Sequence, residues 1–170
     1  MGDKEGVFYW KRESEETGSI HLPKHKLKIM VWGGVRATGK TKLYFLNENV
    51  TAKSYQKILN ECLDEKNTEN NRVLQDNASA HKAHTTLDWF DSKGIELIDL
   101  YPANSSDLNE IEFVWSWMKH DVNKQNPETT EKLKEAIQTS WDRLPQGTIK
   151  KYISHVQTVC NKIVETKGDN

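Results

Sequence analysis

The stretch Val73-Leu74-Gln75-Asp76-Asn77-Ala78 places a carboxylate directly after a short apolar run. The run predicts a buried strand, and asparagine is typical of the turn that follows one. Asp76 is therefore expected at the carboxyl end of a strand, which is where open α/β sheets place their ligands. This stretch predicts an α/β fold and makes Asp76 the first candidate site residue.

A second carboxylate, Glu112, ends the segment Asp107-Leu108-Asn109-Glu110-Ile111-Glu112. Thirty-five residues separate it from Asp76. Asn109 is suited to cap a helix, and acidic residues in the first turn are stabilised by the positive end of the helix dipole. The apolar positions of this helix form one stripe, made of Ile111, Val114, Trp115, Met118 and Val122. Glu112 flanks the stripe, so we expect its carboxylate to face the sheet edge.

Strands and helices alternate along the rest of the chain. Apolar runs predict strands at residues 7–11, 28–35, 42–46, 73–75 and 95–98, with a hairpin turn at 36–40. Helical spacing predicts helices at 51–65, capped by Asn49 or Thr51, and at 82–93, stopped by Gly94. Two more helices are expected to bury Leu133, Ile137, Trp141 and Leu144 in one, and Ile149, Tyr152, Ile153, Val156, Cys160 and Ile163 in the other.

Length and composition indicate one domain spanning residues 1–170. No apolar run is long enough to span a bilayer, and no leader-like segment is visible, so no membrane contact and an intracellular location are expected. Cys62 and Cys160 are too few and too far apart for a disulfide framework or a zinc site.

The net charge of -1 hides an uneven distribution along the chain. Residues 61–112 carry 4 Lys/Arg against 12 Asp/Glu, whereas residues 1–60 carry 11 against 6. An acidic centre beside a basic segment suits a metal site next to a polyanion, although solvated charged faces give the same pattern. The candidate phosphate-binding residues are Lys24, Lys26, Lys28, Arg36, Lys40 and Lys42.

Residues 34–41, with the sequence Gly-Val-Arg-Ala-Thr-Gly-Lys-Thr, fit the nucleotide-binding pattern G-x-x-x-x-G-K-[ST]. A working loop of this kind opens a helix whose N-terminal amides hold the phosphates. The residues that follow, Lys42-Leu43-Tyr44-Phe45-Leu46, have a strand pattern instead. We therefore interpret the segment as a hairpin turn and expect no nucleotide cofactor, with nucleotide binding as the weaker alternative.

Asp76 and Glu112 together suggest a centre for metal-dependent phosphoryl transfer. Two carboxylates with one or two Mg²⁺ ions can activate a nucleophile and stabilise the leaving oxygen of a phosphodiester. His81, five residues after Asp76, would orient a water or contact a phosphate there. The alternatives are two unrelated surface carboxylates and a histidine that only begins a helix.

Three segments, in this order, resemble the mariner superfamily of transposases. They are Met30-Val31-Trp32-Gly33-Gly34, Gln75-Asp76-Asn77-Ala78-Ser79-Ala80-His81, and Pro102-Ala103-Asn104-Ser105-Ser106-Asp107-Leu108-Asn109-Glu110-Ile111-Glu112. The resemblance runs from about residue 8 to residue 168. It implies a ribonuclease-H-like fold, a mixed sheet flanked by helices, in which three acids bind Mg²⁺ or Mn²⁺ for DNA cleavage and strand transfer. Asp76 matches the second acid and Glu112 the third.

Three departures from the family pattern affect the expected activity. The family's first acid lies upstream of a Tyr-Trp like Tyr9-Trp10, and this alignment places it before Met1. The first strand is therefore expected to be missing or incomplete, and Asp3 is the only local candidate to replace the acid. We also expect the family's N-terminal helix-turn-helix modules to be absent. Ser106 and Glu110 replace two family prolines, and Ser106 is expected to loosen the loop before the helix.

The leading hypothesis is a DDE-type transposase endonuclease domain that uses Asp76, Glu112 and His81 on DNA. The resemblance implies a nuclear location in a eukaryotic host and allows a homodimer. The alternative hypothesis is an inactive, domesticated module that binds nucleic acid or associates with itself.

Overall fold

The computed structural model describes residues 7–9, 27–63, 72–98 and 108–166. Lys24, Lys26, Asp3 and Ser106, for which the sequence made predictions, lie outside these ranges. The described elements alternate between strands and helices, as expected for an α/β fold.

The described strands form three small sheets. β1 (Val7–Tyr9), β2 (Lys28–Trp32) and β5 (Tyr44–Leu46) pair antiparallel in the order β1-β2-β5. β3 (Val35–Arg36) and β4 (Gly39–Lys40) form a hairpin, and β6 (Arg72–Val73) pairs parallel with β7 (Glu96–Leu97). Among the described residues no ladder joins β6 to the β1-β2-β5 sheet. Parallel and antiparallel pairing are thus both present, but in separate sheets.

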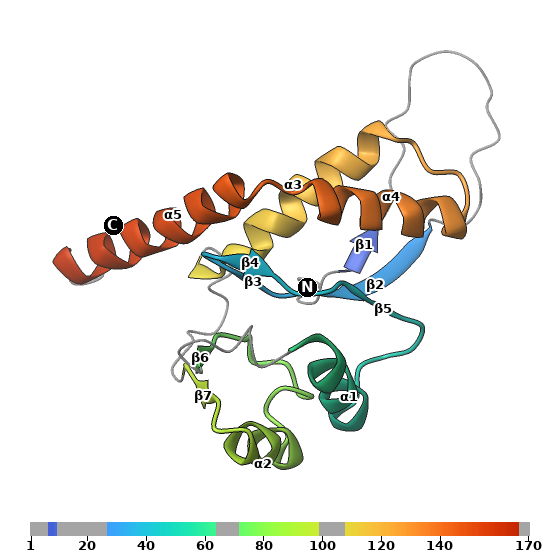
Figure 1. Ribbon diagram of the computed structural model, residues 1–170. Coiled ribbons are helices and arrows are strands. Elements are labelled where there is room, and N and C mark those ends of the chain that lie inside the picture. The colour runs from blue at the N-terminus through green and yellow to red at the C-terminus, as the bar shows by residue number, and fades with distance from the viewer. Residues whose placement is uncertain (1–6, 10–26, 64–71, 99–107, 167–170) are drawn as a thin grey trace.

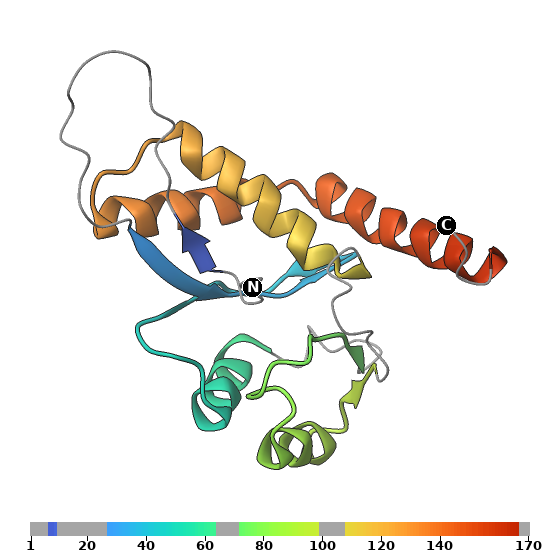
Figure 2. The same cartoon turned by 180° about the vertical axis from the view of Figure 1, so that it is seen from behind.

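Five helices cover the two sides of these strands (Figures 1 and 2). α3 (Glu110–Lys124), α4 (Thr130–Arg143) and α5 (Gln146–Glu165) lie on one side. α1 (Ala52–Cys62) and α2 (His84–Ser92) lie on the other, together with β6 and β7. Each side has its own core. The larger one packs β2 against α3, α4 and the start of α5, and the smaller one joins α1 to α2. No described helix has the length and apolar character needed to cross a bilayer.

Local signals in the sequence set the helix ends. Thr51 caps α1 in a capping box with Ser54, Asn109 caps α3, and Thr129 caps α4. Gly94 adopts a φ of 64°, the left-handed conformation that ends a helix at glycine, which confirms the predicted stop of α2. α2 begins at His84 and not at residue 82, because the backbone at 78–82 closes a turn on the Ala78 carbonyl.

The final helix is confirmed as α5, but only the first half of its apolar stripe is covered by other elements. Ile149 is buried, and Tyr152 and Ile153 pack against the larger core. Beyond them the helix extends past the body of the molecule, so Val156 is only half-buried, and Cys160 and Ile163 are exposed. An apolar stripe predicts which face a helix would bury, but it carries no information on where its partner elements end.

Trp141 is the centre of the larger core. Its side chain is 2% exposed, stacks on Trp115 with ring centroids 5.7 Å apart, and donates from Nε1 to the Thr41 carbonyl at 3.0 Å. The strand end at Gly33 comes so close that a Cβ there would lie 3.0 Å from Trp141 Cη2. A side chain at position 33 would therefore require the rings of Trp141 and Trp115 to shift by a few tenths of an ångström.

The hairpin interpretation of residues 34–41 is confirmed. The Thr41 amide donates to the Gly34 carbonyl at 2.9 Å, and the chain continues into β5 instead of a helix. The Lys40 ammonium donates to the carbonyls of Trp141, Asp142 and Leu144 at the end of α4. These are carbonyls that a helix end leaves without intrahelical partners, and a cation is favoured there. The lysine of the apparent nucleotide motif thus ties the hairpin to a helix.

Replacing Lys40 by Met is expected to lower the free energy of unfolding by about 1–2 kcal/mol, because the α4 carbonyls lose a charged donor while the aliphatic packing remains. Lys42→Met is the matched control, since Lys42 is exposed two residues further along. Urea unfolding of both variants, followed by circular dichroism, measures the difference. Equal stability of the two variants would show that the contact of Lys40 with the α4 carbonyls does not stabilise the domain.

Candidate active site

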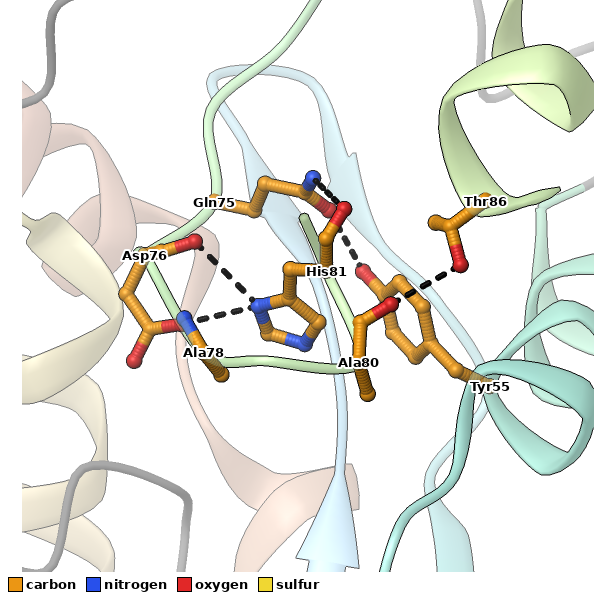
Figure 3. Close-up of polar contacts among 7 residues, drawn as sticks. All are labelled: Tyr55, Gln75, Asp76, Ala78, Ala80, His81 and Thr86. Carbon is orange, nitrogen blue, oxygen red and sulfur yellow. Dashed lines mark hydrogen bonds and ion pairs between the residues drawn. The ribbon is translucent and has the colours of Figure 1, made fainter. Parts of the chain in front are cut away.

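Asp76 lies three residues after Val73, the last residue of β6, so it is beyond the carboxyl end of a strand that is shorter than the predicted one. Its side chain is 17% exposed, and Oδ1 accepts a hydrogen bond from the Ala78 amide at 3.0 Å. That contact is a turn in which an aspartate side chain bonds to the backbone two residues on. The same oxygen lies 2.8 Å from His81 Nδ1. Figure 3 shows the other carboxylate oxygen on the side away from His81, toward the α3 ribbon.

His81 is held so that its ring faces Asp76 (Figure 3). The imidazole is buried and packs on the Tyr55 ring, with centroids 4.3 Å apart. Tyr55 donates from its hydroxyl to Gln75 Oε1 at 2.8 Å, and Gln75 Nε2 donates to the His81 carbonyl at 3.4 Å. The smaller core thereby fixes the ring, and the ring in turn fixes one carboxylate oxygen of Asp76.

Glu112 lies in the first turn of α3, where its amide donates to the Asn109 carbonyl at 3.1 Å. The residue is half-buried. Burial raises the pKa of its carboxyl, the charge of Lys119 lowers that pKa, and the charge of Asp76 raises it. The influence of Asp76 indicates that the two carboxylates are near enough to repel each other.

Both carboxylates line one cavity of about 410 Å³, which lies between the two sides of the molecule. Asp76 reaches it from the side of α1 and α2, and Glu112 from the side of α3. Two carboxylates suit Mg²⁺ or Mn²⁺, because such ions are bound through one or two carboxylates and keep several waters. A cation would also reduce the repulsion between the charges of Asp76 and Glu112. In the described part of the chain, no three His, Cys, Asp or Glu side chains converge on one point.

The candidate phosphate-binding residues do not gather at one place. Lys28 and Lys42 are exposed, Lys40 is bound to the α4 carbonyls, and Arg36 is half-buried in the wall of the cavity. Lys24 and Lys26 belong to the part that the structure leaves undescribed.

No local pattern in the sequence indicates the contacts that orient Asp76. Tyr55 falls within the helix predicted at 51–65, and Gln75 ends the strand predicted at 73–75. The hydrogen bond between their side chains joins residues 20 apart. Only the spacing of five residues between Asp76 and His81 hinted at their contact.

A family model described as DDE superfamily endonuclease matches residues 8–134, which is most of the chain. The chain belongs to the DDE superfamily endonucleases. The Tc3 transposase of Caenorhabditis elegans is 31% identical to this DDE endonuclease domain over 147 residues, 83% of this chain and 44% of that protein. The Tcb2 transposase of Caenorhabditis briggsae is 24% identical over 144 residues, 82% of this chain and 52% of that protein.

Solved structures agree on the fold of this DDE endonuclease domain. The Mos1 strand transfer complex superposes with a TM-score of 0.75 and 21% identity, covering 96% of this chain and 50% of that one. The catalytic domain of the Mos1 mariner transposase superposes with a TM-score of 0.69 and 19% identity. The match covers 96% of this chain and 82% of that one. The predicted resemblance to mariner transposases and the ribonuclease-H-like fold are both confirmed. The domain spans about half the length of the two nematode transposases.

Proposed function

We propose that this domain provides a metal-dependent centre for DNA cleavage and strand transfer, with Asp76 and Glu112 holding Mg²⁺ or Mn²⁺. The observation that carries the proposal is the pair of carboxylates, one from each side of the molecule, in the wall of one cavity. Mos1 structures solved with Mn and with Mg, and as strand transfer and paired-end complexes, support the metal and the DNA substrate. A paired complex would need a second copy of the chain, and work on chromosomal DNA would place it in the nucleus of a eukaryotic host.

Each side chain has a distinct part in this proposal. A bound divalent ion supplies Lewis acidity that stabilises charge developing on the phosphate oxygens. Asp76 presents one oxygen to that ion while its Oδ1 is held by His81 and the Ala78 amide. Glu112 would provide the second carboxylate for the ion from the first turn of α3. His81 acts as a positioning residue, because its Nδ1 faces the carboxylate.

The direct test combines metal binding with cleavage. The purified chain is titrated with Mn²⁺ while amide resonances are observed by NMR, and it is incubated with supercoiled plasmid and Mn²⁺ or EDTA. We expect paramagnetic broadening centred on Asp76 and Glu112, together with nicking that EDTA abolishes. Absence of both broadening and nicking contradicts the proposed function.

Substituting His81 by Ala is expected to weaken Mn²⁺ binding by about 10–100-fold, the range found when a partner that orients a metal ligand is removed. His84→Ala is the matched control, because His84 also faces an aspartate, Asp88, at 3.0 Å but is 89% exposed. Calorimetric titration measures both affinities, and thermal unfolding checks that both variants fold. Unchanged Mn²⁺ affinity in His81→Ala would show that Asp76 needs no such support.

A further inference from the structure

The β3–β4 hairpin forms part of the wall of the cavity that contains the two carboxylates. Arg36, Ala37 and Lys40 line the cavity together with Asp76 and Glu112. Both overall views place this hairpin beside the first turn of α3, the turn that carries Glu112 (Figures 1 and 2). A cation on the hairpin therefore belongs to the wall of the cavity that holds the two acids.

Three Lys or Arg side chains line the cavity within the described ranges, and each of them also has contacts inside the protein. Lys40 binds the carbonyls at the end of α4. Arg72 pairs with Glu96 at 3.1 Å across the β6–β7 ladder. Arg36 is half-buried. A guanidinium has five N–H donors, so Arg36 can bind a phosphate while keeping a contact inside the protein.

Hydrogen bonds from α5 hold the main chain at Arg36 in place. Gln146 Nε2, in the first turn of α5, donates to the carbonyls of Arg36 at 3.1 Å and Ala37 at 2.8 Å. The tie between Lys40 and α4 holds the other strand of the same hairpin. A cation on a fixed element binds a phosphate with less loss of conformational entropy than one on a free loop.

Arg36 and the two acids come from different elements of the cavity wall. Arg36 lies on β3, Asp76 follows β6, and Glu112 lies in the first turn of α3. DNA entering the cavity would therefore place one phosphate at the acids and a neighbouring one at the hairpin.

We propose that Arg36 holds the DNA phosphate next to the reacting one and so positions the strand over Asp76 and Glu112. This inference rests on the proposed function. A polyanion that approaches two carboxylates is repelled, and a guanidinium beside them offsets that repulsion. Arginine also matches the geometry of phosphate with two parallel hydrogen bonds, which a lysine cannot make.

The test is the salt dependence of DNA binding by the full chain, measured as fluorescence anisotropy of a labelled duplex in Ca²⁺. Arg36→Gln is expected to weaken binding about tenfold and to reduce the slope of log affinity against log salt by about 0.9, the value for one lost phosphate contact. Arg36→Lys should keep the slope, because the charge remains. Lys132→Gln, an exposed change at the far end of α4, should alter neither quantity.

The outcomes separate this inference from the proposed function. If the unmodified chain binds the duplex without salt dependence, the proposed action on DNA fails. If the unmodified chain shows the dependence and Arg36→Gln keeps its full slope, only the role of Arg36 is overturned, even when affinity falls. A folding defect in Arg36→Gln would appear in its thermal unfolding. The affinity of Arg36→Lys then decides the question, because a lysine cannot make the two parallel hydrogen bonds to the phosphate, and unchanged affinity would overturn the role of Arg36.

Discussion

Asp76→Asn is expected to abolish the stabilisation of this domain by Mn²⁺ and to reduce nicking of DNA by more than about 100-fold. Metal that binds only the folded chain stabilises it by about 2.7 kcal/mol at a concentration about a hundred times Kd. For a domain of this size that corresponds to roughly 5–10 °C in Tm. The amide of asparagine is a poor ligand for Mn²⁺, so the shift should disappear. Thermal unfolding with and without Mn²⁺ measures it.

The stability of Asp76→Asn without metal provides the control. The new amide oxygen can still accept from the Ala78 amide and His81 Nδ1, and one of two repelling charges is gone. The metal-free variant should therefore unfold within about 1 kcal/mol of the original. Glu112→Gln should behave in the same way. A Mn²⁺ shift that survives both substitutions would remove these carboxylates from the metal site.

Trp141→Ala is expected to destabilise the domain by about 3–5 kcal/mol, a large part of the stability of an ordinary domain. The indole is almost completely buried, stacks on Trp115, and gives its N–H to the Thr41 carbonyl. Truncation would leave a cavity against Gly33, and the Thr41 carbonyl would lose its donor. Urea unfolding followed by circular dichroism measures the loss.

Trp141→Phe keeps the prediction testable if the alanine variant does not fold. Phenylalanine preserves most of the ring packing but has no N–H, so we expect a smaller loss of about 1–3 kcal/mol. Trp89→Phe serves as the control, because Trp89 is only half-buried and its N–H donates to exposed Asn60 at 3.2 Å. A loss no larger at Trp141 than at Trp89 would show that the larger core does not depend on the buried indole.

The helices could be predicted because their signals are local. Thr51, Asn109 and Gly94 act on backbone groups within a few residues, and the apolar stripe of α3 follows from the helical repeat alone. The two carboxylates were found in the same way, as an acid after a strand and an acid in a first helical turn. The order of the mariner-like segments then predicted the ribonuclease-H-like fold.

The sequence by itself thus determined the family and most of the elements, and it named Asp76 and Glu112 as the candidate acids. Only the tertiary structure decided that Lys40 binds the end of α4, that His81 faces Asp76, and that the second half of α5 extends past the body. Lys40 and its α4 partners are about 100 residues apart, and no local pattern encodes such a pairing. The sequence specifies which chemical groups a side chain carries. Which groups it contacts depends on how elements distant in the sequence pack together, and that packing decided these three features.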